Sequence, residues 1–195
     1  MQVVRRRLTL AAGLALVVVA VLSLVQPADH AVKEITLPLR HDDIIRQQAA
    51  DKNVDAALIA AVIYTESRFR DQTSHAGAKG LMQLMPETAD YIARKTGGTR
   101  FERADLATPQ INIAYGTWYL RYLLDKYEGN TILTLAAYNG GEGKVDEWRR
   151  DAASRGEKFR VASHVPFKET REYVHRVLKA RADYRSNYAQ ELGLV

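Results

Sequence analysis

Residues 55–67 read DAALIAAVIYTES, and this stretch decides how the rest of the sequence is interpreted. Apolar side chains surround almost the whole of the helix that it would form, and they stack at i, i+4 spacing. A helix of this kind belongs in a protein core rather than on a surface. Glu66 is the exception, because it lies four residues beyond Val62 and eight beyond Leu58 and so shares their face. We therefore predict a buried helix that carries one carboxyl group near its C-terminal end.

The flanking sequence predicts further helices and no sheet. Asp42 and Asp43 are suited to cap the first of them, and the pair Thr108-Pro109 is typical of a cap followed by a first helical turn. Glycines provide most of the stop signals, and no internal repeat is present. The predicted helices span residues 44–51, 86–95, 109–127, 131–139, 143–153 and 168–184. Together with the first helix they form an all-α domain over residues 42–190.

The position of Glu66 has consequences for its acidity. Burial disfavours the charged form of a carboxyl group, and the negative end of a helix dipole disfavours a further negative charge. Both effects raise the pKa, which suits a general acid that works near neutral pH. The alternative is an exposed glutamate at a fraying helix end, and position alone does not separate the two.

Three downstream motifs accompany Glu66. Residues 77–86 (GAKGLMQLMP) form a glycine-rich turn that lets backbone approach a ligand, and Gln83 there offers an amide to sugar hydroxyl and acetamido groups. Residues 136–141 (AAYNGG) place an aromatic hydroxyl and an amide at a helix end, and residues 166–174 (PFKETREYV) open the last helix. Each motif alone is a weak signal, whereas their order is specific.

In this order the motifs resemble the lytic transglycosylases of the soluble-lytic-transglycosylase (SLT) type, which are similar to glycoside hydrolase family 23 and share a goose-type-lysozyme-like helical fold. The matching pieces extend over about residues 55–178, essentially the whole predicted domain. They are Glu66-Ser67, Ser74-x-x-Gly77-Ala78, Gly80-Leu81-Met82-Gln83, Asn112 with Gly116, Ala137-Tyr138-Asn139-Gly140 and Glu169-Thr170-x-x-Tyr173-Val174.

The resemblance implies a role for each matching residue. Glu66 corresponds to the single catalytic glutamate of the family, and Ser67 supports the helix end. The positions that line the sugar cleft or lie beside the catalytic glutamate are Ser74, Gln83, Met85, Tyr138, Asn139 and Glu169, with Tyr173 in the closing motif. One departure concerns Ser74, because the stretch from Glu66 to Gly77 is a residue shorter than usual and His75 stands where the family often has proline.

The resemblance also implies a reaction. Glu66 would protonate the β-1,4 bond between N-acetylmuramic acid (MurNAc) and N-acetylglucosamine (GlcNAc) in peptidoglycan, and then deprotonate the 6-hydroxyl to give a 1,6-anhydro product. No cofactor or metal is required. A muramidase is the alternative, and a hydrolase normally needs a second carboxylate, for which Asp71 and Asp90 are the candidates. A glycan-binding module without activity is a third interpretation.

The N-terminus predicts export. Arg5, Arg6 and Arg7 precede an uncharged run over residues 8–25, long for a signal peptide and barely long enough to span a bilayer. The basic cluster should remain in the cytoplasm. We expect residues 1–28 to be a signal or anchor segment, more readily an uncleaved anchor in the cytoplasmic membrane, and residues 29–41 to be a tether. The catalytic domain would then lie in the periplasm or cell envelope as a monomer.

Composition excludes several other classes of function. The net charge of +5 falls to +2 without residues 1–28, because Lys+Arg drops from 28 to 25 while Asp+Glu stays at 23, so nucleic-acid binding has no support. The absence of cysteine rules out disulfides and thiol catalysis. Five scattered histidines contain no His-x-x-x-His pair for zinc. The tyrosines of the predicted helix 109–127 are interpreted mainly as packing residues, although they could stack on sugars.

Overall fold

The computed structural model describes residues 33–195, so the predicted signal or anchor segment lies outside the described residues. The chain divides into two units, Met1–Pro38 and Leu39–Val195. The described part of the first unit is a helical turn at residues 33–36 and the two residues after it. Among the described helices, none is both long and apolar enough to cross a membrane.

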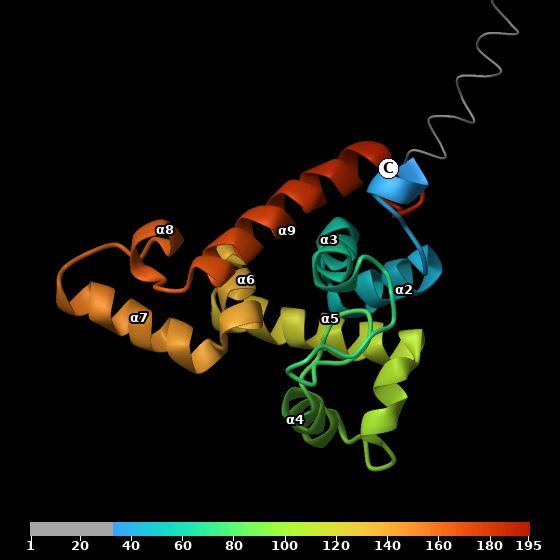
Figure 1. The fold of residues 1–195 in the computed structure, drawn as a ribbon, viewed down its shortest axis with the longest axis horizontal. Helices are drawn as coiled ribbons and strands as arrows, with labels where there is room; N and C mark the ends of the chain where they lie inside the picture. Colours follow the sequence, from blue (N-terminus) through green and yellow to red (C-terminus); the bar gives the residue numbers. More distant parts are fainter. Residues whose placement is uncertain (1–32) are drawn as a thin grey trace, which may run out of the picture. The chain divides into compact units, whose positions relative to one another are not determined.

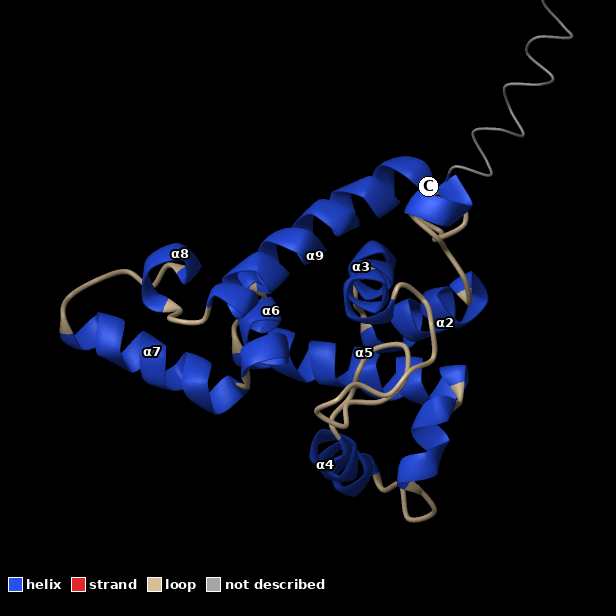
Figure 2. Ribbon diagram, in the orientation of Figure 1, coloured by secondary structure: helices blue, strands red, loops and turns tan. Residues whose placement is uncertain are grey.

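The second unit is built from helices, as Figures 1 and 2 show, which confirms the all-α prediction. Within residues 33–195 the only β-type pairing consists of two isolated bridges, Thr73 with Lys79 and Lys79 with Leu84. The elements are α2 (Asp42–Lys52), α3 (Ala56–Ser67), α4 (Pro86–Thr96), the short 3-10 helix η1 (Arg103–Ala107), α5 (Pro109–Lys126), α6 (Thr131–Gly140), α7 (Glu142–Ser154), α8 (Val161–His164) and α9 (Lys168–Asn187).

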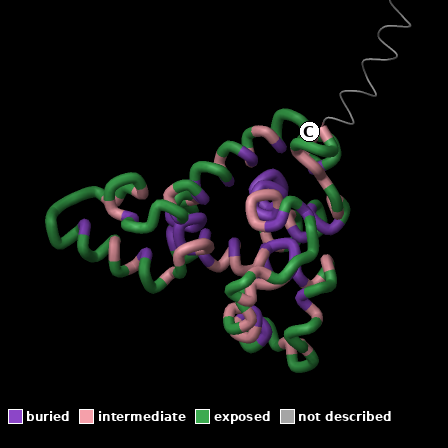
Figure 3. Tube along the Cα trace, viewed as in Figure 1, coloured by how far each residue is buried: buried purple, intermediate pink, exposed green. Residues whose placement is uncertain are grey.

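α3 lies in the core, as its composition predicts. Residues 56–63 are buried without interruption, and α9 and α2 pack along the helix (Figure 3). Asp55 caps it by accepting a hydrogen bond from the Ala57 amide at 3.1 Å, and the same carboxylate pairs with Arg181 of α9 at 2.5 Å. The cap therefore also fixes the position of α9 along α3.

α5 connects the two ends of the core. It contacts α2, α4, η1 and α6, and its buried face includes Ile113, Leu120 and Leu123. α6 packs on α5, α7 and α8 follow at left in Figure 1, and α9 returns across α6 to α3. The last helix of the chain, α9, thus packs against α3, one of the first.

The structure corrects two capping predictions and adds two elements. His41, in a left-handed conformation, is the N-cap of α2 and makes no side-chain cap, so Asp42 and Asp43 instead occupy the first turn, where carboxylates favour the helix dipole. Thr108 holds the N-cap position of α5, but its hydroxyl makes no cap bond. η1 and α8 were not predicted, because four or five residues are too few to show a helical period.

Candidate active site

Glu66 occupies the last turn of α3 with its side chain partly buried. Burial raises its pKa from the ordinary 4.5 to about 7. The neighbouring hydroxyl of Tyr173 and the positive charge of Arg176 oppose that rise, whereas the negative charge of Glu169 adds to it. All three of these residues belong to α9. At neutral pH Glu66 is therefore present in both its protonated and its ionised form.

Two phenols accompany Glu66. Tyr173 is only 2% exposed, and its hydroxyl forms no hydrogen bond of standard geometry with the described residues, although it is close enough to Glu66 to favour the carboxylate. The hydroxyl of Tyr138, on α6, donates to the carbonyl oxygen of Met82 at 2.9 Å. Burial, with the charge of Glu66 second, raises the pKa of both phenols well above the ordinary value. Both hydroxyls therefore keep their protons, and that of Tyr138 donates one hydrogen bond.

The loop between α3 and α4 is fixed by side chains from three helices. Asn112 of α5 accepts a hydrogen bond from the Met82 amide at 2.8 Å and donates to the carbonyl oxygens of Lys79 and Leu106 at 3.0 and 2.9 Å. Ser67, next to Glu66, donates from its hydroxyl to the Leu81 carbonyl at 2.7 Å. Together with the bond from α6 to Met82, these contacts hold residues 79–82 beside the end of α3.

Two glycines make this close approach possible. A Cβ atom on Gly80 would lie 2.0 Å from the Asn112 side-chain nitrogen, and Gly80 also has a φ of +76°. A Cβ atom on Gly116 would lie 2.3 Å from the sulfur of Met82. The loop backbone and Met82 therefore pack directly against α5, which only glycine allows at both positions.

Strained backbone conformations occur directly after α3 and in the loop between α3 and α4. Arg68 and Phe69, directly after α3, have φ values of 51° and 60°, and Gln83 has a φ of 46°. Left-handed conformations are costly for residues with a Cβ atom and persist where the surroundings enforce them. Phe69 is held by burial, with its ring centroid 6.2 Å from that of Tyr184. This strain turns the chain sharply after Glu66.

The predicted sugar-binding residues fall into two groups. Ser74 and Gln83 use polar groups within the loop: the Ser74 hydroxyl accepts from the Ala78 amide at 3.0 Å, and the Gln83 amide nitrogen donates to the carbonyl oxygens of Gln72 and Gly80. The side-chain carbonyl of Gln83 accepts no hydrogen bond within the described part of the chain. It is the group of this residue that is left for a ligand.

The other predicted residues are more accessible. Met85 is 40% exposed, which is unusual for a large apolar side chain beside a turn. Asn139 and Glu169 line one recess of about 320 Å³ between the end of α6 and the start of α9. Tyr138 precedes Asn139 and faces Glu66 instead. The structure thus brings Tyr138 and Glu169 close enough to interact electrostatically with Glu66, and it places Asn139 beside Glu169.

Sequence reasoning missed Arg176 and gave little weight to a second group of residues near this site. Arg176 follows Tyr173 by three residues and so shares its face of α9, a spacing that could have identified it. The second group is a series of partly exposed aromatic rings. Tyr119 lies 5.6 Å from Tyr138 and 6.0 Å from Tyr122 between ring centroids. Further rings follow through Trp118 and Tyr91. These rings pack against one another, as the packing interpretation predicts, and each also keeps an exposed part.

No group of three or more potential metal ligands lies within residues 33–195. Of the two additional carboxylates considered from the sequence, Asp90 is bound by Arg103, whose guanidinium nitrogen lies 2.6 Å away and whose hydrogen bond lowers the pKa of Asp90. Asp71 is exposed in the loop after α3. The carboxylate that acts electrostatically on Glu66 is that of Glu169.

The raised pKa of Glu66 predicts a pH-dependent stability. The folded protein binds one proton more than the unfolded chain between pH 4.5 and about 7, so this residue lowers the free energy of unfolding progressively as pH rises through that window. Replacing Glu66 by Gln should therefore raise the free energy of unfolding at pH 8 by up to about 3 kcal/mol and change little at pH 4. Urea unfolding at pH 4, 6 and 8 measures this.

The exposed Glu147 of α7 provides the matched control, and its replacement by Gln should have no comparable pH dependence. A stability gain in Glu66→Gln of equal size at pH 4 and pH 8 would show that burial does not shift the pKa of this glutamate.

Comparison with known proteins places this site in context. The family model described as "Transglycosylase SLT domain" matches residues 43–160. The soluble lytic murein transglycosylase of Escherichia coli (strain K12) is 34% identical over 154 residues, which are 78% of this chain and 24% of that protein. The membrane-bound lytic murein transglycosylase C of Glaesserella parasuis serovar 5 (strain SH0165) is 32% identical, over 80% of this chain and 52% of the relative.

Solved structures give the same result for the fold. The 70 kDa soluble lytic transglycosylase of Escherichia coli matches with a TM-score of 0.73 and 32% identity, over 83% of this chain and 26% of that one. An inactive Glu-to-Gln variant of the lytic transglycosylase Slt from Pseudomonas aeruginosa matches with a TM-score of 0.70 and 34% identity, over 79% of this chain and 25% of that one. The chain thus spans about a quarter of the length of the first of these relatives.

Proposed function

The chain belongs to the transglycosylase SLT-domain family, and from this premise we propose that it is a peptidoglycan lytic transglycosylase. Its substrate would be the glycan strand, cut at the MurNAc–GlcNAc β-1,4 bond without water to leave 1,6-anhydroMurNAc ends. The observation that carries the proposal is a single partly buried glutamate with a pKa of about 7, flanked by two phenols that stay protonated. A group of that pKa can give and take a proton at neutral pH.

The proposed reaction uses Glu66 twice. Protonated Glu66 gives its proton to the glycosidic oxygen as the bond between that oxygen and C1 of MurNAc breaks. The acetamido oxygen of MurNAc stabilises the positive charge that develops on C1. The Glu66 carboxylate then removes the proton of the MurNAc 6-hydroxyl while the oxygen of that hydroxyl bonds to C1. The proton lost in the first step is recovered in the second, so the enzyme ends unchanged.

The surrounding residues have distinct roles in this proposal. The hydroxyl of Tyr173 stabilises the carboxylate form of Glu66 between the two steps, and Arg176 favours the same form. Tyr138 positions the backbone at Met82. Sugar contacts come from the free carbonyl of Gln83 and from groups around it, namely Ser74, Met85, Asn139 and Glu169. The partly exposed rings from Tyr138 to Tyr122 offer stacking surfaces for successive sugars.

Tyr138→Phe tests the positioning role. Loss of the hydroxyl leaves the Met82 carbonyl without its donor, and we expect the free energy of unfolding to fall by about 1–2 kcal/mol and turnover to fall about tenfold. Release of soluble muropeptides from purified cell walls measures turnover, and thermal unfolding measures stability. Tyr115→Phe is the control, since the Tyr115 hydroxyl lies beside Gly98 and makes no hydrogen bond to Met82. Full turnover in Tyr138→Phe would contradict the role.

Hydrolysis by a muramidase is the second candidate function. The carboxylate of Glu169 acts electrostatically on Glu66 and would be the group that activates water. Asp90, held by Arg103, and the exposed Asp71 are less suited to that role. We favour the transglycosylase because the first curated relatives carry that name.

Mass spectrometry of digested peptidoglycan separates the candidates. We expect anhydro-muropeptides from the wild type and none from Glu66→Gln. Muropeptides with reducing ends would instead identify a muramidase. No product from either protein, with binding to glycan retained, would identify a binding module.

We propose the cell envelope as the location. Support comes from the basic cluster and uncharged run of residues 1–28 and from the name of a membrane-bound relative. Residues 29–41 would serve as a tether and residues 42–190 as the catalytic domain of a monomer. Comparing the intact mass of the protein in membrane and soluble fractions tests whether the leader is retained.

A further inference from the structure

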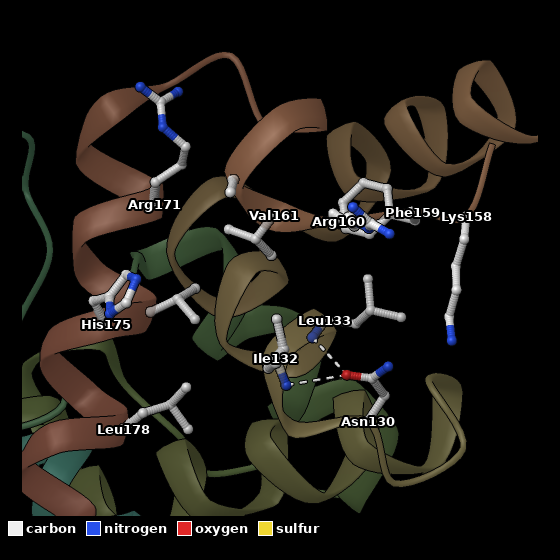
Figure 4. Close-up of a pocket in the computed structure, with 12 residues that line it drawn as sticks. Asn130, Ile132, Leu133, Lys158, Phe159, Arg160, Val161, Arg171, His175 and Leu178 are labelled. Carbon is white, nitrogen blue, oxygen red and sulfur yellow. Dashed lines mark hydrogen bonds between the residues drawn. The ribbon is translucent and has the colours of Figure 1, made fainter. Parts of the chain in front are cut away.

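A recess of about 600 Å³ opens between α6, α8 and α9, lined also by the segment that precedes α8 (Figure 4). Its size is in the range of sites that hold a ligand or a few side chains of a partner. Apolar residues form the floor, and these are Ile132, Leu133, Val161, Val174 and Leu178. Ile132 is 46% exposed, which leaves a large apolar surface uncovered at the edge of the floor.

The recess lies on the opposite face of α9 from the active site. α9 contributes to it through Arg171, Val174, His175 and Leu178, a spacing that defines one helix face. The α9 residues that act on Glu66 are Glu169, Tyr173 and Arg176. Each of them is followed two positions later by a residue of the recess, namely Arg171, His175 and Leu178. Two positions correspond to a rotation of about 200° around a helix. A ligand in this recess would therefore leave the Glu66 side of α9 free.

The rim of the recess is cationic on two sides. Figure 4 shows Arg171 and His175 on one side of the apolar floor and Lys158 and Arg160 on the other. No aspartate or glutamate occurs among the lining residues. α6 also begins at the floor, with Asn130 as its cap, so the positive end of that helix dipole adds to the potential there.

These positive charges lack a carboxylate partner within residues 33–195. No ion pair joins Lys158, Arg160 or Arg171 to an acidic residue there; Arg171 donates instead to the carbonyl oxygens of Val165 and Pro166 at 2.6 and 2.9 Å. The adjacent Glu157 is occupied by His164 at 2.7 Å and by Arg155. The recess thus combines an apolar floor, exposed most at Ile132, with unneutralised positive charge on both sides.

We infer that this recess is the docking site for an acidic peptide segment of another protein. Apolar side chains of the segment would cover the floor, and carboxylates on either side of them would meet Arg171 and His175 at one edge and Lys158 and Arg160 at the other. The N-terminal segment of this chain is a poor occupant, because residues 1–28 contain three arginines and no carboxylate. An anionic lipid carries its charge at one end only, which matches one edge and not both.

A phage-displayed library of random 12-residue peptides, selected on the full-length protein, tests the inference. We expect enrichment of peptides that contain at least two apolar residues flanked by Asp or Glu. Fluorescence polarisation of a labelled enriched peptide should show binding that the double variant Lys158→Glu/Arg160→Glu weakens by at least about tenfold, since close charge pairs are reversed. Added salt should weaken binding by the wild type as well.

Two further variants make the result specific. Arg149→Glu/Arg150→Glu alters exposed residues of α7 by the same net charge and should leave peptide binding within about twofold of wild type. Ile132→Glu places a carboxylate at the exposed edge of the floor and should abolish binding, and because Ile132 is half exposed the variant should fold. Circular dichroism and thermal unfolding check the fold of each variant.

Several outcomes would overturn the inference. These are no enriched peptide, enriched peptides without carboxylates, or equal binding by Lys158→Glu/Arg160→Glu and wild type. The protein could instead sediment together with phosphatidylglycerol vesicles. If Lys158→Glu/Arg160→Glu reduces this co-sedimentation and Arg149→Glu/Arg150→Glu does not, the recess is a lipid site. A dimer seen by analytical ultracentrifugation and dissociated by the same variant would identify a second copy of the chain as the occupant.

Discussion

Glu66→Gln should reduce the release of soluble muropeptides by at least about a thousandfold while the protein remains folded. General acid or base catalysis by one side chain contributes about a hundred- to ten-thousandfold, and here one group performs both steps. Glutamine preserves the size of the side chain but can neither give nor accept the proton. Because burial disfavours the charged carboxylate, the variant should also be more stable than wild type above pH 7.

The measurement compares initial rates on purified cell walls for Glu66→Gln, Glu147→Gln and wild type. Glu147 is exposed on α7, and its replacement should leave the rate within about twofold of wild type. A Glu66→Gln rate within about tenfold of wild type would remove Glu66 from the mechanism. Unchanged binding to glycan with no turnover supports the mechanism, because binding and chemistry then separate.

Asn112→Ala should lower the free energy of unfolding by about 3–5 kcal/mol. The side chain is fully buried and makes three hydrogen bonds, to the Met82 amide and to the Lys79 and Leu106 carbonyls. Each buried group that loses its partner costs about 1–3 kcal/mol. For a domain of this size that loss corresponds to a fall in melting temperature of roughly 10 °C or more.

The effect should extend to activity, because the loop that Asn112 holds also carries Gln83 and Met85. We expect the turnover of Asn112→Ala to fall below that of wild type even at temperatures where the variant is fully folded. Thr117→Val is the matched control on the same helix: the Thr117 hydroxyl is buried and has no hydrogen-bond partner among residues 33–195, so its removal should be neutral or stabilising. Equal destabilisation by both variants would contradict the role assigned to Asn112.

The fold was predictable where local signals are strong. The apolar periodicity, with prolines as start signals and glycines as stop signals, located all seven of the longer helices to within a few residues. The N-cap of α2 was misplaced, because a histidine in a left-handed conformation has no distinctive sequence signal. η1 and α8 were missed because helices of four or five residues are too short to show a periodic pattern.

The site was only partly predictable. Glu66 was identified from its place on an apolar helix together with the order of the downstream motifs, and Gln83 from its motif. The sequence could not show that the Gln83 nitrogen is bound within the loop and that only its carbonyl is free. Neither could it show that Arg176 lowers the pKa of a residue that lies 110 positions earlier. Such effects depend on distances between elements that are far apart in sequence.

The sequence by itself determined the longer helices, the place of a carboxyl group near the end of α3 and the family to which the chain belongs, because periodicity and motif order can be read along the chain. Only the tertiary structure decided what that carboxyl group can do. Its pKa of about 7 results from burial and from Tyr173, Arg176 and Glu169 on α9, which the packing of α9 against α3 brings together. Desolvation and Coulomb interactions depend on distance in space, and the linear sequence does not contain that distance.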